Sequence, residues 1–94
     1  MKKIYKYPLE FTNYQTLQLP RGAKVISAIN QRDQIMLYAI VDTAEQELTT
    51  VEVSFEVVVQ PTGLAFENID AYQFLSTVSL NDALYVFHLF YRQL

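Results

Sequence analysis

A long alternation of apolar and polar side chains between Leu48 and Gln60 constrains the fold of this chain more than any other feature. Every second residue from Val51 to Val59 is apolar, four of those five are β-branched valines, and most of the residues between them are polar. Period two places successive side chains on opposite faces of a strand. The segment is therefore predicted to be a β-strand with one buried face and one mostly solvated face.

Further strands are expected on both sides of this segment. Ile35 to Val41 and Leu84 to Phe90 are apolar at both parities, which is typical of central strands covered on both faces. Mixed or shorter patterns predict the remaining strands at Ile4 to Tyr7, Thr16 to Leu19, Lys24 to Asn30 and Ala71 to Leu80.

Turn residues separate these segments. Asn81-Asp82 and Gln31 to Asp33 are expected to form hairpins, because Asn and Asp tolerate left-handed backbone angles. Turns are also expected at residues 20–22 and 61–63, and single helical turns at the capping-box spacing of residues 43–46 and at residues 64–70. The predicted fold class is all-β: a small antiparallel meander of six or seven strands, forming a sandwich or a partly closed barrel.

Length and composition set further limits. A chain of 94 residues is expected to form one domain, residues 1–94. Its residues are 51% hydrophobic and only 18% charged, so few polar side chains are available to cover the surface. We therefore expect some apolar surface to meet a partner, and we expect a homo-oligomer, most simply a homodimer.

The sequence contains no evident membrane helix or signal peptide. The longest wholly apolar run, Ile35 to Val41, has seven residues, whereas a membrane helix needs about 20. Lys6 and Pro8 interrupt any signal-peptide core near the start. The absence of cysteine fits a reducing compartment. A cytoplasmic protein without membrane association is expected.

Charge is distributed unevenly along the chain. Residues 1–32 contain six bases and one acid, whereas residues 33–91 contain nine acids and no Lys or Arg. Two interpretations follow: strands of opposite sign lie side by side and partly neutralise one another, or two surfaces of opposite sign steer a partner.

The residues that could support catalysis do not form a recognisable set. His88 is the only histidine and lies among apolar neighbours, so a structural role is expected. Glu52 and Glu56 are about 13 Å apart along one strand, farther than the paired carboxylates of glycosidases, about 5 to 9.5 Å. They are interpreted as a solvated face, with a cross-strand carboxylate left open. With two glycines and no cysteine, neither a phosphate loop nor a thiolate metal site is expected, and no catalytic, cofactor or metal residue is predicted.

Aromatic residues raise the alternative of nucleic-acid binding. The chain has seven tyrosines and six phenylalanines, and bases stack on such rings in small barrels. A cationic groove is also required, however, and a run of 59 residues lacks any Lys or Arg. This charge pattern argues against a nucleic-acid partner.

Several short motifs resemble a family of short phage and prophage proteins. Lys2-Lys3-Ile4-Tyr5-Lys6-Tyr7-Pro8-Leu9, Leu19-Pro20-Arg21-Gly22-Ala23 and Leu37-Tyr38-Ala39-Ile40-Val41-Asp42 are similar to its K-x-Y/F-P-L, L-P-x-G-A and L-x-A-x-V-D patterns. Near the end, residues 76–78 and 86–90 resemble its G-T-V and V-W-H-V-F segments, with Ser76 and Phe87 departing from the usual glycine and tryptophan. The resemblance implies a phage setting in the cytoplasm of an infected or lysogenic cell. It assigns no particular activity and no site residues.

The expected function is that of a non-enzymatic phage accessory protein that binds another protein, with steric blockade of a bacterial host-defence protein as the specific activity. The alternative is a structural or assembly component of the virion or of a replication complex. Aromatic anchors carry most of the binding energy in such interfaces, and rim charges mainly change the association rate. Strand parity places the first two tyrosines opposite Ile4, so the predicted protein-binding residues are Lys3, Tyr5, Lys6, Tyr7 and Tyr14.

Overall fold

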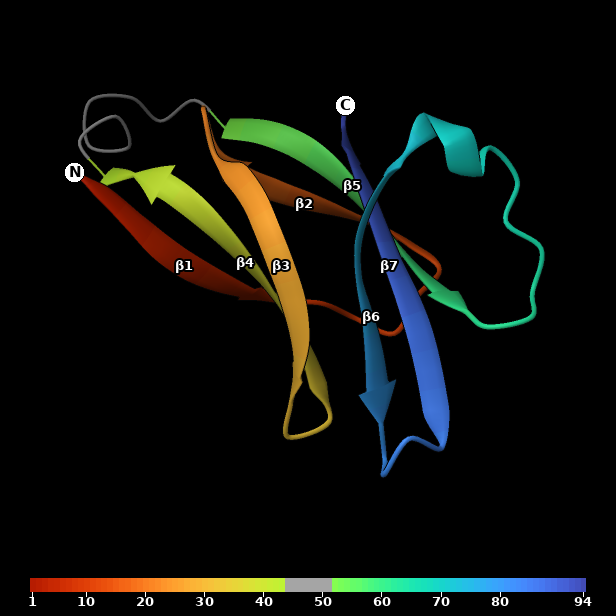
Figure 1. Ribbon diagram of the computed structural model, residues 1–94. Helices are drawn as coiled ribbons and strands as arrows, with labels where there is room; N and C mark the ends of the chain where they lie inside the picture. The colour runs from red at the N-terminus through yellow and green to blue at the C-terminus, as the bar shows by residue number, and fades with distance from the viewer. Residues whose placement is uncertain (44–51) are drawn as a thin grey trace.

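The computed structural model describes residues 1–43 and 52–94, in which the regular structure is seven β-strands and one short 3-10 helix. The elements are β1 (Lys2–Pro8), β2 (Tyr14–Pro20), β3 (Lys24–Gln31), β4 (Gln34–Asp42), β5 (Glu52–Pro61), η1 (Ile69–Ala71), β6 (Gln73–Leu80) and β7 (Tyr85–Gln93). The predicted all-β fold is confirmed (Figure 1). The helical turn expected at residues 64–70 is limited to η1. Residues 44–46 of the capping box and residues 48–51 of the long strand lie outside the described residues.

The strands form two antiparallel sheets that face each other. One sheet has three strands in the order β1-β4-β3, and the other has four in the order β2-β5-β7-β6, without closure into a barrel. Strands β4 and β7 are interior strands of their sheets, as their apolar sequences predict. β5 is also an interior strand, and the expectation that its second face is mostly solvated is wrong at Val58 and Gln60, which are buried. The connections are not those of a simple meander, because only the β3–β4 and β6–β7 pairs are neighbours in the sequence.

The loop between β1 and β2 carries the chain from one sheet to the other. The backbone N–H of Leu9 donates to Ile35 of β4 at 2.9 Å, and four residues later the carbonyl of Asn13 accepts from Val59 of β5 at 2.9 Å. The Leu9 side chain is fully buried between these points. Because this crossing separates β1 from β2, each pairs with a strand distant in sequence.

A single buried cluster joins the inward faces of both sheets. Ile35, Leu37 and Ala39 of β4 and Val57 and Val59 of β5 are all almost inaccessible to solvent. They follow the period-two pattern of their strands. The alternation predicted for residues 51–59 is therefore confirmed over the described part of β5, since its inward positions form the centre of the core.

One side of the sandwich is held by side chains instead of a backbone ladder. The edge strands β3 and β6 each contain a bulge, between Val25 and Ser27 and between Phe74 and Ser76. The Ser76 hydroxyl donates to the Ala28 carbonyl at 2.8 Å, and the Asn30 amide donates to the Ser79 carbonyl at 2.8 Å. A bulge disrupts regular backbone pairing along a strand edge. The side-chain bonds therefore join β3 to β6 without making the two sheets continuous.

The turns use left-handed backbone angles as predicted, with one difference. Arg32 and Asp33 both have positive φ and form the two-residue β3–β4 hairpin. The β6–β7 loop is longer than the expected Asn81-Asp82 turn, because Leu80 pairs with Tyr85 and residues 81–84 lie between them. Ala83 also has a positive φ, of 67°, which is uncommon for a residue other than glycine or asparagine.

Candidate protein-binding surfaces

Part of the outer face of the four-stranded sheet is covered by the chain itself. Residues 62–72, between β5 and β6, fold back along the outer side of β7 (Figure 1). The Phe66 ring meets Phe90 edge-on at a centroid distance of 5.2 Å and Tyr72 at 5.4 Å. Val58 is on this outer face, paired with Phe90, and its exposed fraction is 0%. The loop therefore forms a second, small apolar core.

An ion pair closes one end of this covering loop. The Glu56 carboxylate accepts from the Tyr72 hydroxyl at 2.5 Å and from Arg92 Nε at 3.0 Å, and the Arg92 guanidinium lies over the Tyr72 ring at 4.7 Å. The expectation that Glu56 is simply solvated is therefore wrong: its cross-strand neighbour is Arg92, which attracts it. Glu52 is exposed, as expected. This arrangement holds the loop, because Glu56 binds both Tyr72 of the loop and Arg92 of β7.

His88 secures the other end of the loop. One ring nitrogen, Nε2, is 2.6 Å from the Thr62 hydroxyl, and Nδ1 is 3.0 Å from the Thr77 hydroxyl. A hydroxyl can donate or accept, so both ring nitrogens have partners in either tautomer and in the protonated ring. This geometry supports the structural role expected for His88, which joins the loop to β6.

The outer face of the three-stranded sheet differs because no described segment covers it. Its outward positions follow from the register: Ile4 pairs with Ile40, Tyr38 pairs with Ser27, and Met36 pairs with Ile29. Ile4 is 61% exposed and Ile29 is 46% exposed. The same face carries three exposed lysines at its margin, Lys2, Lys6 and Lys24. We define the lysine-framed face as these three lysines together with the outward side chains between them, which are Ile4, Ile26, Ser27, Ile29, Met36, Tyr38 and Ile40.

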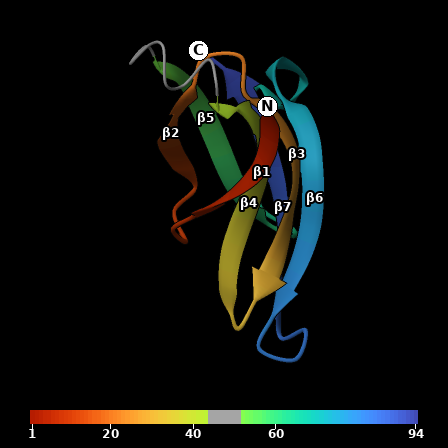
Figure 2. The same ribbon diagram turned by 90° about the vertical axis from the view of Figure 1, so that its left-hand side faces the viewer.

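Charge on the lysine-framed face is mainly positive. Of the described residues at its outward positions, Asp42 is the one carboxylate, and it accepts a hydrogen bond from the amino terminus at 3.2 Å. The positive start of the sequence is thus concentrated on one sheet. Figure 2 views the molecule from this side, with β1 passing in front of β7.

The predicted binding residues do not form one surface. Lys3, Tyr5, Lys6 and Tyr7 all lie on β1, but Tyr14 lies on β2, on the outer face of the other sheet. Within β1 the odd-numbered residues pair with inward positions of β4, so Ile4 and Lys6, not the tyrosines, face outward. Tyr7 packs against the core, and burial, with smaller contributions from Tyr5 and Glu52, raises the pKa of its phenol.

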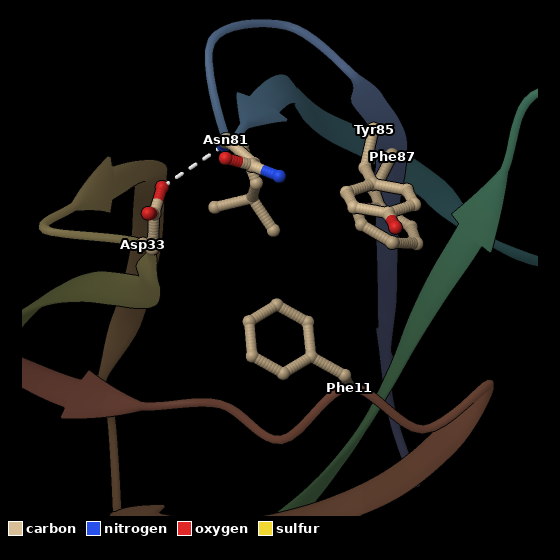
Figure 3. Close-up of a pocket in the computed structure, with 6 residues that line it drawn as sticks. Phe11, Asp33, Asn81, Tyr85 and Phe87 are labelled. Atoms are coloured by element: carbon tan, nitrogen blue, oxygen red, sulfur yellow. Dashed lines mark hydrogen bonds between the residues drawn. The ribbon is translucent and has the colours of Figure 1, made fainter.

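A second apolar surface lies at the end of the sandwich where the hairpins turn. A pocket of about 330 Å³ is lined by residues of the β1–β2 loop, the β3–β4 turn and the β6–β7 hairpin: Phe11, Asp33, Leu80, Asn81, Tyr85 and Phe87. In Figure 3 the Phe11 ring points into the same space as Tyr85 and Phe87. Asp33 accepts from the Asn81 backbone N–H at 3.0 Å and joins the two hairpins. With the exposed Leu84, these residues form the hairpin-end patch.

Tyr85 is an accessible aromatic side chain, although it lies on an interior strand. Tyr85 is 54% exposed, whereas Tyr5 is 36% exposed. β7 is an interior strand, but its first residue lies at the hairpin end of the sandwich and borders the pocket. Position along a strand therefore matters as much as position within a sheet.

Sequence reasoning missed most of the lysine-framed face. Lys24 and Ile29 both face outward because the bulge between Val25 and Ser27 changes the alternation of β3, and this bulge has no simple sequence signal. A signal for the rest was present, since Ile35 to Val41 is apolar at both parities and one parity has to face outward. That outward parity was expected to be covered, and among the described residues it is not.

Sites for other chemistry are not evident among residues 1–43 and 52–94. No group of three or more His, Cys, Asp or Glu side chains in these ranges is placed to hold a metal ion. No helix there is long and apolar enough to span a membrane.

Comparison with known proteins places the whole chain in a single family. Residues 1–94 match a family described as a domain of unknown function, DUF7352. The chain belongs to the DUF7352 family. No curated protein and no solved structure matches it. The DUF7352 match covers both sheets, the covering loop and both exposed surfaces, and the family description names no activity.

Replacing His88 tests its role in holding the covering loop of this DUF7352 domain. His88→Phe removes the partner of two threonine hydroxyls and is expected to lower the free energy of unfolding by about 1 kcal/mol, with a smaller loss in His88→Gln. Urea denaturation measures the change, and a cycle with Thr77→Val should show less than additive losses. Loss of partner binding with an unchanged free energy of unfolding would instead indicate a direct binding role.

Titration of Tyr72 tests the ion pair at the other end of the loop. The hydrogen bond to the Glu56 carboxylate, followed by burial, raises the pKa of the Tyr72 phenol above its ordinary 10.0. A raised folded-state pKa stabilises the protein fully below the unfolded pKa, and this contribution is lost as pH rises through the folded pKa. The absorbance difference between the wild type and Tyr72→Phe isolates this phenol. Glu56→Gln should lower its pKa, and a wild-type value at or below 10.0 would contradict the arrangement.

Proposed function

We propose that this protein is a non-enzymatic binding protein whose lysine-framed face contacts another protein. One observation carries the proposal: the covering loop buries the outward side chains around Val58 and Phe90 on one sheet, although Tyr14 and Phe74 stay exposed at its edges. No described segment covers the apolar outer face of the other sheet. Apolar side chains at the centre of a face with charged residues at its margin are typical of protein interfaces. The resemblance to short phage proteins favours steric blockade of a bacterial host-defence protein in the cytoplasm, and the alternative is a structural part of a virion or replication complex.

The charge of the face favours an acidic partner. Lys2, Lys6 and Lys24 lie around the exposed isoleucines, and Asp42 lies at one corner beside the amino terminus. Complementary charge at an interface margin mainly accelerates association and selects partners. A symmetric dimer through this face would place lysines opposite lysines, which opposes self-association there.

Removing apolar side chains from the lysine-framed face should weaken partner capture. The Ile4→Ser/Ile29→Ser variant removes two exposed side chains from this face and should weaken binding at least about tenfold. The matched control is Leu64→Ser/Ile69→Ser, because these side chains are 62% and 43% exposed on the covering loop. Affinity purification from the cells that encode the protein, followed by mass spectrometry and a direct binding assay, compares the three proteins. Equal binding by both variants would refute the proposed face.

Self-association remains a prediction, and the hairpin-end patch is the better surface for it. Phe11, Leu84 and Tyr85 are exposed there. Lysine is absent from the lining of its pocket, so two copies can meet without repulsion between lysines. Light scattering should give twice the chain mass of 10.9 kDa, and Leu84→Ser/Tyr85→Ser should give a monomer. A monomeric wild type, or a dimer unaffected by this substitution, would contradict the prediction.

A further inference from the structure

The strand at the margin of the lysine-framed face has one edge that pairs with no described strand. β1 pairs with β4 on one side, and the three-stranded order β1-β4-β3 places its other side at the sheet edge. Backbone groups along such an edge can pair with a strand from another chain. Which residues offer those groups follows from the hydrogen bonds at the two ends of β1.

The bonds at both ends involve odd-numbered residues. Thr43 donates its N–H to the Met1 carbonyl at 2.9 Å, and Leu9 donates its N–H to the Ile35 carbonyl at 2.9 Å. In an antiparallel pair, residues that bond the partner alternate with residues that point away from it. The register between these ends is continuous, so Lys3, Tyr5 and Tyr7 bond β4, and Lys2, Ile4 and Lys6 direct their N–H and C=O groups to the open edge.

Pro8 is consistent with this assignment. Proline has no backbone N–H and is tolerated in a strand where that group would face outward. Pro8 is an even-numbered residue of β1, paired with Met36, so β4 loses no hydrogen bond to it.

The side chains of the same even-numbered residues select the incoming strand. Lys2, Ile4 and Lys6 face outward in the order base, apolar, base, and Ile4 is the exposed centre. Side chains directly opposite on neighbouring strands lie close enough to attract or repel. A matching strand therefore has the order acid, any residue, apolar, any residue, acid. A second copy of β1 would place lysine against lysine.

We propose that β1 receives an extended acidic segment of the partner protein by strand addition, with acidic side chains opposite Lys2 and Lys6 and an apolar side chain opposite Ile4. This inference deepens the proposed function and rests on it. Lysines at an edge also discourage uncontrolled pairing. The same lysines thus disfavour neutral or basic strands and admit acidic ones.

A synthetic peptide provides the test without knowledge of the partner. The probe has the sequence Thr-Glu-Thr-Ile-Thr-Glu-Thr, and the control peptide has Lys in place of each Glu. Amide hydrogen exchange by NMR is expected to slow at Lys2, Ile4 and Lys6 when the Glu peptide binds, while Lys3, Tyr5 and Tyr7 stay as protected as before. The Lys peptide should bind about tenfold more weakly.

Two variants separate strand addition from general attraction. Ile4→Pro removes one outward N–H but no bond to β4, so it should abolish peptide binding while the melting temperature stays close to that of the wild type. Lys2→Glu/Lys6→Glu should reverse the preference and bind the Lys peptide better than the Glu peptide. This second variant keeps the test decisive if Ile4→Pro does not fold.

The outcomes distinguish this inference from the proposed function. Equal binding of both peptides, no binding of either, or slowed exchange without the even-numbered pattern would overturn strand addition. If Ile4→Ser/Ile29→Ser still loses the cellular partner in that case, the lysine-framed face remains the binding surface without an added strand. If that variant retains the partner, the proposed function itself fails.

Discussion

Packing between the inward faces of the two sheets is the interaction on which the rest of the structure depends. Leu37 and Ala39 of β4 and Val57 and Val59 of β5 belong to one buried cluster. Because period two sends every other side chain inward, burial of this set fixes which side chains face outward on each sheet. A slip of one residue in either strand would exchange the two faces.

The outward faces of the two sheets differ in how far the described chain covers them. The interior strands β4 and β7 carry apolar side chains on both sides, and residues 62–72 cover part of the outer side of the four-stranded sheet. Phe66 and Tyr72 supply the apolar contact, and Glu56, His88 and Arg92 hold the ends of the loop. The other outward face has lysines at its margin in place of a described covering segment. We interpret this difference as the division between a structural face and a binding face.

Strand order determines where the charged side chains of the sequence lie on the molecule. Lys2 of β1 is paired with Asp42 of β4, as expected if strands of opposite sign lie side by side. Lys2, Lys6 and Lys24 lie on one sheet, and steering of a partner by this charge stays a prediction. β1 combines that positive charge with an open edge. A partner segment that pairs with the backbone of the β1 edge and places acidic side chains near the lysines is therefore recognised more specifically than one that contacts the apolar face alone.

The sequence alone determined the fold class, the inward set of β5 and the positions of the hairpins, because these depend on local periodicity and on residues that tolerate left-handed angles. It also indicated a structural role for His88. Tertiary structure decided which strands pair, that Ile4 and not Tyr5 faces outward, and that Tyr14 belongs to the other sheet. Those features depend on long-range pairing: β1 meets β4 and β2 meets β5 only because Leu9 and its neighbours cross between the sheets. A local pattern shows that a strand has two different faces, but only pairing with a neighbouring strand decides which face is directed to the core.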